Sequence, residues 1–283
     1  MPSGPSSSPG SSPGPGPSIG ALLGNSPLNP LETRILLIHA TGLTRVQLIT
    51  RPERVLTADE AANFHALLQR RVDGEPIAYI VGAREFYGLS FEVTPDVLIP
   101  RPETELLVEL ALSHLPPDGR LLDMGTGSGA IAVAIAHARP DAKVTALDVS
   151  PAALEVAGRN ARRHGVAVDF QRSDWFAALD DRQFDLIVSN PPYIVSGDRH
   201  LAQGDLRFEP VDALTDHADG LSALSTIIAG AALHLVSAGW LFVEHGYDQA
   251  AAVRQLAEAH GFAEVQSRQD LAGIERVTGG IKR

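Results

Sequence analysis

The chain has 283 residues, no cysteine and a formal net charge of −11. Without cysteine it can form no disulfide, no thiolate nucleophile and no cysteine-ligated zinc or iron–sulfur centre. The acidic balance argues against broad electrostatic binding to nucleic acid or to anionic lipid, because both need clustered Lys and Arg.

The beginning of the chain is of low complexity. Residues 1–18 are Ser, Gly and Pro apart from Met1, so they offer too little apolar surface to offset the entropy lost on ordering. We therefore predict a disordered tail, taken to residues 1–30. It lacks the basic start and apolar run of a secretory signal, and no Arg precedes Arg34 as a mitochondrial presequence would require. Since no run of about 18 apolar residues follows, we expect a cytoplasmic protein that spans no membrane.

Residues 31–84 predict a helical domain for substrate recognition. An apolar repeat begins at Leu31 and stops at Gly42, and a short helical turn follows at 45–49. A longer helix is expected over 57–72, with Thr57 as cap and Glu60 three residues on as its capping-box partner.

Residues 85–105 predict a linker between two domains. Glu85–Val93 alternates around Gly88, which indicates a β-hairpin, and Ile99–Glu105 forms a rigid turn before a helix that opens at Glu103 or Thr104. The net charge is −1 over 31–95 and −10 over 96–283, and this shift also places a domain boundary near the linker.

Strands and helices alternate through residues 106–283, which predicts a mostly parallel, seven-stranded, Rossmann-like α/β sheet with helices on both faces. Ligands of such sheets bind at the carboxyl ends of the strands. We expect strands at 120–124, 143–147, 166–171, 184–189, 239–244, 262–268 and 274–278, and helices at 129–138, 151–164, 221–236 and 248–260, with 194–220 irregular.

A glycine-rich loop follows the first of these strands. In Asp123–Gly129 (DMGTGSG), glycines let the backbone turn sharply and approach a ligand at the start of the next helix. Asp148 ends the next strand, where a carboxylate can accept hydrogen bonds from both ribose hydroxyls. Gly125, Gly127 and Ala130 also satisfy the G-x-G-x-x-A dinucleotide pattern.

The loop after the third strand contains Ser173–Phe176 (SDWF). Trp175 offers a ring face for adenine and Asp174 an acceptor for its exocyclic amine. The pattern up to this point therefore indicates an adenosine-containing cofactor and leaves NAD and S-adenosylmethionine both open.

The fourth strand ends in Asn190-Pro191-Pro192-Tyr193. The prolines fix the backbone and cannot donate hydrogen bonds, so the segment offers acceptors: the Asn190 amide oxygen and the Pro191 carbonyl. Two rigid acceptors beside the flat face of Tyr193 suit a planar NH2 group. The segment therefore predicts a site that positions an amino or amide nitrogen for reaction.

Together DMGTGSG, ALDVS, SDWF and SNPPY resemble the class I S-adenosylmethionine-dependent methyltransferases that modify planar amino groups. The stretches 85–93 and Leu98–Glu105 resemble more specifically the HemK/PrmC family of peptide chain release factor glutamine methyltransferases. This resemblance extends over residues 30–280. The family implies a helical N-terminal domain, a hairpin linker and a catalytic domain at 106–283. It methylates the side-chain amide nitrogen (N5) of the Gln in the GGQ loop of bacterial release factors 1 and 2.

The resemblance implies roles for individual residues. Asn190, Pro191, Pro192 and Tyr193 would bind the substrate amide, with Asn190, Pro191 and Tyr193 catalytic. Glu209-Pro210 and Asp219–Leu221 also look like the family, whereas Thr215–Ala218 departs from its usual Gly-Gly. The residues implied for S-adenosylmethionine are Gly125, Thr126, Gly127, Ser128, Gly129, Asp148, Asp174, Trp175 and Asn190.

Three other readings are open at this point. A DNA or RNA exocyclic-amine methyltransferase shares the Asn-Pro-Pro-Tyr logic, but the −10 domain offers one basic cluster, at Arg159, Arg162 and Arg163. An NAD-dependent dehydrogenase leaves Asn190–Tyr193 without a role, and a non-catalytic binding module leaves Asn190 without one. We expect a monomer that binds release factors and no DNA, and no metal, since the ten His form no ligand pattern.

Overall fold

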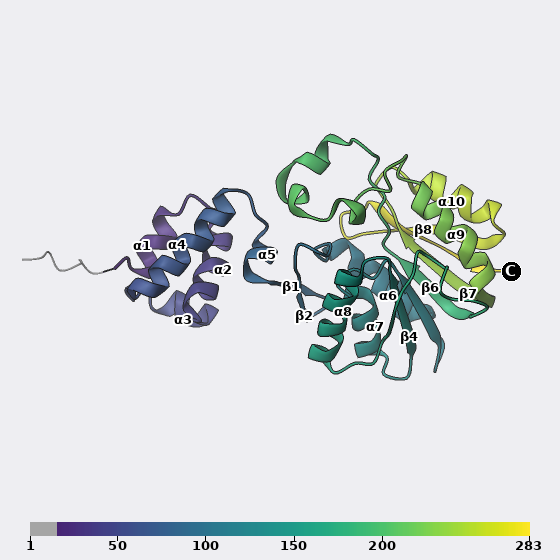
Figure 1. The fold of residues 1–283 in the computed structure, drawn as a ribbon, viewed down its shortest axis with the longest axis horizontal. Helices are drawn as coiled ribbons and strands as arrows, with labels where there is room; N and C mark the ends of the chain where they lie inside the picture. Colours follow the sequence, from purple (N-terminus) through teal and green to yellow (C-terminus); the bar gives the residue numbers. More distant parts are fainter. Residues whose placement is uncertain (1–15) are drawn as a thin grey trace, which may run out of the picture. The chain divides into compact units, whose positions relative to one another are not determined.

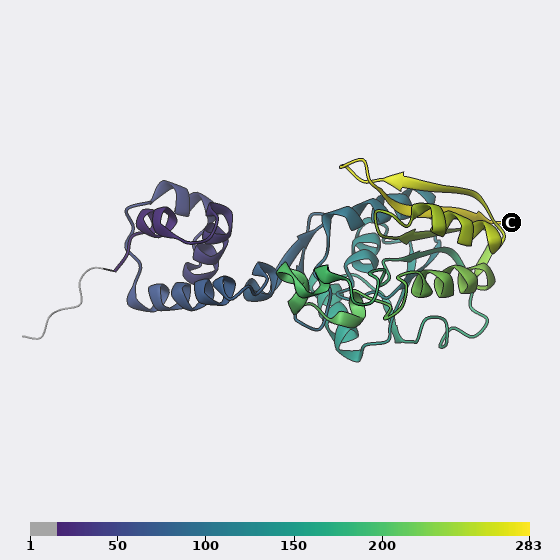
Figure 2. The ribbon, with the colours of Figure 1, turned by 90° about the horizontal axis from the view of Figure 1, so that it is seen from above.

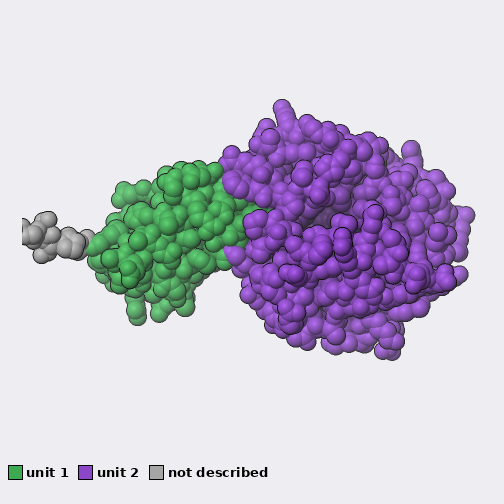
Figure 3. All heavy atoms as spheres, viewed as in Figure 1, with its two compact units in different colours: residues 1–81 green, residues 82–283 purple. Residues whose placement is uncertain are grey.

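The computed structural model describes residues 16–283, and the expected disorder of residues 1–15 lies outside the described residues. The chain divides between Val81 and Gly82 into two compact units, coloured separately in Figure 3. The described part of the first unit is helical, and the second unit contains the strands of the described residues (Figure 1).

The first unit is built from five helices: α1 (Ile19–Asn25), α2 (Pro30–Thr41), α3 (Arg45–Thr50), α4 (Ala58–Val72) and α5 (Ile77–Val81). Helix α1 corrects the expectation that the disordered tail reaches residue 30. Ile19 is fully buried against Leu36 and Leu37 of α2, and Ser18 caps the helix by accepting a hydrogen bond from the Ala21 N–H. The apolar residues after Ser18 supply the apolar surface that the composition of residues 1–18 does not offer.

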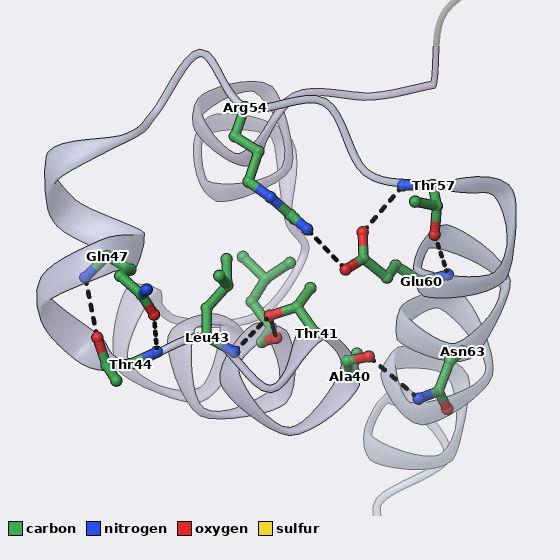
Figure 4. A network of polar contacts seen from close by, with 10 residues as sticks. Ala40, Thr41, Leu43, Thr44, Gln47, Arg54, Thr57, Glu60 and Asn63 are labelled. Atoms are coloured by element: carbon green, nitrogen blue, oxygen red, sulfur yellow. Dashed lines mark hydrogen bonds and ion pairs between the residues drawn. The ribbon is translucent and has the colours of Figure 1, made fainter.

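Paired caps define the starts of α3 and α4 (Figure 4). The Thr57 hydroxyl accepts from the Glu60 N–H at 3.2 Å, and the Glu60 carboxylate accepts from the Thr57 N–H at 2.9 Å, which is the capping box expected from the sequence. Thr44 and Gln47 form a second one. Glu60 also accepts from Arg54 at 2.7 Å. Each cap contributes about 1 kcal/mol, so these caps set the helix boundaries.

The second unit begins with an antiparallel hairpin, β1 (Ala83–Phe86) and β2 (Leu89–Glu92), as expected. The Asn160 side chain ties it to α8 (Pro151–His164) by accepting from the Glu92 N–H at 2.7 Å and donating to the Glu92 carbonyl at 3.0 Å. A 3₁₀ turn, η1 (Pro102–Thr104), then leads into α6 (Glu105–His114). The hairpin is therefore part of the second unit.

The central sheet has seven strands in the order β5-β4-β3-β6-β7-β9-β8. Strands β5, β4, β3, β6 and β7 are parallel, whereas β9 pairs antiparallel with β7 and with β8, seen in yellow in Figure 2. The strands are β3 (Arg120–Met124), β4 (Lys143–Asp148), β5 (Asp169–Arg172), β6 (Phe184–Ser189), β7 (Leu235–Glu244), β8 (Phe262–Gln269) and β9 (Glu275–Lys282).

Helices cover both faces of this sheet (Figure 1), and each face has its own apolar core. Leu121 of β3 faces a core shared with α6, α7 (Ala130–Ala138) and α8, and its neighbour Leu122 faces a core shared with α9 (Ser222–His234) and α10 (Ala250–Ala259). The fold expected from the sequence, a mostly parallel seven-stranded α/β sheet, is confirmed. Because the chain runs outward through β3, β4 and β5 and then returns to β6, the switch point lies between β3 and β6.

Candidate active site

A cavity of about 290 Å³ lies at the carboxyl ends of β3, β4 and β6, where the switch point places a ligand site. It collects most of the cofactor-binding residues expected from the sequence, together with residues that the sequence did not single out. Its lining is formed by Asp96, Val97, Leu98, Met124, Gly125, Gly127, Leu147, Asp148, Val149, Ser150, Ala153, Ser173, Asp174, Trp175, Asn190, Pro192, Pro210, Asp212 and Ala213.

The glycine loop turns tightly between β3 and α7. Gly125 and Gly127 have φ values of +70° and +55°, which favour glycine, and a Cβ added at either would meet no atom within 4 Å. Since both residues line the cavity, such a Cβ would occupy ligand space. At Gly129 a Cβ would instead lie 3.0 Å from the Ala157 Cβ, so this glycine allows α7 to pack on α8.

Thr126 and Ser128 brace the loop and do not line the cavity. The Thr126 hydroxyl donates to Asp123 Oδ2 at 2.6 Å, and the Ser128 carbonyl accepts from the Asn160 side chain at 2.9 Å. Asp123 is fully buried and its Oδ1 has no hydrogen-bond partner in the described structure. Burial raises the pKa of this carboxyl to about 7, and the Thr126 hydrogen bond opposes the rise.

Asp148 stands at the end of β4 and joins the loop to α8. Its Oδ2 accepts from the Gly127 N–H and its Oδ1 from the Ser150 N–H, both at 2.9 Å. Ser150 caps α8, as the sequence indicated, so Asp148 is not the N-cap of this helix. Burial raises the Asp148 pKa, and the backbone hydrogen bonds oppose it. Each carboxylate oxygen keeps a further acceptor site for ribose hydroxyls.

Asp174 and Trp175, in the loop after β5, also line the cavity. Trp175 has φ of +45°, an uncommon conformation for a large side chain, and its carbonyl accepts from the Ser173 hydroxyl at 2.6 Å. The indole lies partly buried against the core of α9 and α10 and lines the cavity. Both residues therefore line the cavity, and their binding of an adenine stays a prediction.

The charge of the lining separates the two candidate cofactors. Among the described residues, the lining contains the carboxylates Asp96, Asp148, Asp174 and Asp212 and no Lys or Arg. The pyrophosphate of NAD carries negative charge and would be repelled, whereas the sulfonium and ammonium groups of S-adenosylmethionine would be attracted. The open glycine cradle and this acidic lining both fit S-adenosylmethionine.

The segment after β6 contributes to two cavities. Asn190 and Pro192 line the cavity beside the glycine loop, whereas Tyr193 lines a second one, of about 600 Å³, with Glu103 and Glu244. The Tyr193 hydroxyl donates to Glu244 Oε1 at 3.3 Å, and its carbonyl accepts from Gln249 at 3.0 Å. Pro191 is buried and lines neither. Pro191 and Tyr193, which follow Asn190 closely in the chain, therefore do not line the first cavity.

The Asn190 side chain is held from one side. Its Nδ2 donates to the hydroxyl of Thr104, a buried residue of η1, at 3.1 Å. The sequence suggested Thr104 only as a helix opener, but its side chain makes no capping hydrogen bond. Nothing in the spacing of two residues 86 positions apart points to this contact.

Glu209 fixes the irregular segment over the site. Its buried carboxylate accepts from the Ile99 N–H at 3.0 Å and pairs with Arg101. Within residues 194–220 lie three 3₁₀ turns, η2 (Arg199–Ala202), η3 (Gly204–Phe208) and η4 (Val211–Ala213). Thr215–Ala218, which departs from the family pattern, forms a turn in which Asp216 accepts from the N–H groups of Ala218 and Gly220.

Within 16–283 no three His, Asp or Glu side chains gather in a way that could hold a metal ion. No helix in the same range is long and apolar enough to cross a membrane.

The doubly covered seven-stranded sheet, the glycine loop, the carboxylate after β4 and the acidic cavity define a class I S-adenosylmethionine-dependent methyltransferase. Residues 102–205 match the family described as "Methyltransferase small domain", and residues 20–82 match "PrmC N-terminal domain". A crystal structure of a methyltransferase from Pyrococcus furiosus superposes with a TM-score of 0.54 over 76% of this chain and 96% of that one, at 21% identity, which supports the fold.

Curated relatives cover nearly the whole chain. The release factor glutamine methyltransferase of Burkholderia pseudomallei is 59% identical over 92% of this chain and 94% of its own length. The release factor glutamine methyltransferase of Neisseria gonorrhoeae is 53% identical over 91% of this chain and 95% of its own length. The chain belongs to the release factor glutamine methyltransferase family.

Proposed function

We propose that the protein transfers a methyl group from S-adenosylmethionine to the side-chain amide nitrogen (N5) of the Gln in the GGQ motif of bacterial release factors 1 and 2. The observation that carries this proposal is the position of Asn190: it lines the cofactor cavity while its NH2 group is engaged by Thr104. Its Oδ1 is thereby left as an acceptor for a substrate amide. The family to which the chain belongs supports the identity of that amide.

The residues at the carboxyl ends of β3, β4 and β5 would hold the cofactor. Gly125 and Gly127 leave room beside the backbone, with Thr126, Ser128 and Gly129 keeping the loop in shape. Asp148 would bind the ribose, and Asp174 and Trp175 the adenine. When bound, S-adenosylmethionine supplies an electrophilic methyl group on a sulfonium centre.

The chain's own residues act by positioning the acceptor. The two N–H groups of a glutamine amide can donate to Asn190 Oδ1 and to the Pro191 carbonyl, and the prolines fix both acceptors. Such a frame directs the nitrogen lone pair toward the cavity and Tyr193 offers its ring face to the amide plane, so positioning supplies most of the rate. No strong base is needed, because the amide proton becomes acidic only after alkylation, and no covalent enzyme intermediate forms.

The two units would divide the work. We propose that the helical unit (α1 to α5) and the hairpin (β1 and β2) recognise the release factor, while the rest of the second unit carries out the transfer. The net charge of −10 over residues 96–283 favours a protein substrate over DNA, whose phosphates need basic groups. We also propose that the protein acts as a monomer in the cytoplasm, where release factors function.

The test is to incubate the protein with methyl-labelled S-adenosylmethionine and purified release factor, and to map the label by mass spectrometry. We expect one methyl group, on the Gln of the GGQ motif, and none on a release factor in which this Gln is replaced by Glu. Label on another residue, or on DNA offered in parallel, would overturn the proposal.

A further inference from the structure

Two buried side chains from separate parts of the second unit meet behind Asn190. Thr104 of η1 is 4% exposed and Glu244, the last residue of β7, is 1% exposed. Asn190 donates to the Thr104 hydroxyl at 3.1 Å, and the Thr104 hydroxyl lies close enough to the Glu244 carboxylate to lower its pKa against the effect of burial. Glu244 Oε2 makes no hydrogen bond in the described structure. The charged and titratable groups that face Glu244 are Glu103 of η1, Tyr193 after β6 and Arg276 of β9.

The direction of these hydrogen bonds follows from the number of protons available. A threonine hydroxyl carries one proton, and an ionised carboxylate can only accept. When the Thr104 proton points at Glu244, the Thr104 oxygen can only accept from Asn190. A flipped Asn190 would place its Oδ1 against the Thr104 oxygen, so that two acceptors would face each other in a buried site. In that arrangement the NH2 group of Asn190 faces Thr104, as it does in the structure.

We propose that Thr104, backed by Glu244, is a positioning residue that fixes the Asn190 side chain with Oδ1 toward the methyl-accepting amide. This inference rests on the proposed function, because only an NH2 substrate needs an acceptor from Asn190. A flipped Asn190 would present its own NH2 to the substrate NH2, and two donors would repel. The contact of Thr104 with Asn190, with Glu244 beside it, excludes the flipped orientation of the Asn190 side chain before the substrate binds.

The test compares Thr104→Val, which keeps the shape of the side chain and loses the hydroxyl, with Thr104→Ser, which keeps the hydroxyl. For Thr104→Val we expect kcat on release factor to fall about tenfold, with the KM for release factor and the Kd for S-adenosylmethionine within about threefold of wild type. Thr104→Ser should restore kcat. Thr145→Val, at another buried threonine of the same unit, is the control for general loss of stability and should keep kcat.

A second readout needs no substrate. The side-chain NH2 signals of Asn190, identified by their absence in Asn190→Ala, should exchange slowly with solvent in the wild-type ¹⁵N spectrum and fast in Thr104→Val. Unchanged kcat in Thr104→Val, equal losses in Thr104→Ser and Thr104→Val, or unchanged exchange would each overturn the inference. If the wild type methylates no release factor, the proposed function fails, and the exchange measurement still decides whether Thr104 holds Asn190.

Discussion

Asp123 lies under the glycine loop with one carboxylate oxygen unpartnered, which makes the stability of the second unit depend on pH. Its pKa rises from 3.8 to about 7 on folding. Between these values the unfolded chain is ionised while the folded protein keeps the proton. The stability contributed by Asp123 is therefore complete below pH 3.8 and is lost as the pH rises to about 7, at about 1.4 kcal/mol per pH unit.

The substitution Asp123→Asn removes this dependence, because an amide does not titrate and its oxygen can still accept from Thr126. The whole window corresponds to about 4 kcal/mol, of which about 3 kcal/mol lies between pH 5 and 8. The difference between the free energies of unfolding of the variant and the wild type should therefore shift by about 3 kcal/mol in favour of the variant from pH 5 to pH 8.

Urea unfolding followed by tryptophan fluorescence suits this measurement, because Trp175 and Trp240 both lie in the second unit. Asp141→Asn is the control: a hydrogen bond from Arg139 lowers the pKa of Asp141, so its contribution changes only at more acidic pH. A difference between Asp123→Asn and wild type that stays constant from pH 5 to 8 would refute the reasoning.

Three further predictions concern binding and turnover. Asp148→Ala should raise the calorimetric Kd for S-adenosylmethionine about 10- to 100-fold, since hydrogen bonds to a charged group are lost, and an unchanged Kd would remove Asp148 from the cofactor site. Burial raises the Glu244 pKa to about 7, and a protonated Glu244 no longer requires the Thr104 proton, so wild-type kcat should fall to about one-fifth between pH 8 and 6. This fall should be absent in Glu244→Gln, and a retained midpoint would contradict the link. Val46 and Ile49 are 68% and 60% exposed on one face of α3, so Val46→Asp with Ile49→Asp should raise the KM for release factor at unchanged cofactor Kd. Leu271→Asp, at an exposed turn of the second unit, should not, and equal KM values would argue against recognition through α3.

The sequence predicted the fold because periodicity and turn residues are local signals. Strands β3 and β6 and helix α8 begin and end where the pattern placed them, and the Thr57–Glu60 capping box forms as expected. Helix α1 was not predicted from the sequence, because the disorder expected of the low-complexity residues was carried past Ser18. An apolar segment already begins at Ile19. Local composition thus located most elements but not this boundary.

The cofactor residues could be predicted for a related reason. Gly125, Gly127 and Asp148 follow strands directly, and parallel strands bring their carboxyl ends to one edge of the sheet. The contacts that support these residues could not be predicted from the sequence. Asn190 with Thr104, and Glu209 with Arg101, join residues about a hundred positions apart through packing of the irregular segments, and no spacing in the sequence encodes such pairs.

The central claim is that Asn190 positions an amide for methyl transfer and does not simply shape the cofactor cavity. The most direct measurement is single-turnover methylation of intact release factor by wild type and by Asn190→Ala, with the Kd for S-adenosylmethionine determined on the same samples. We expect a rate about 10²- to 10³-fold lower in the variant and a Kd within about threefold of wild type. A wild-type rate in Asn190→Ala, or a loss explained entirely by weaker cofactor binding, would contradict the claim.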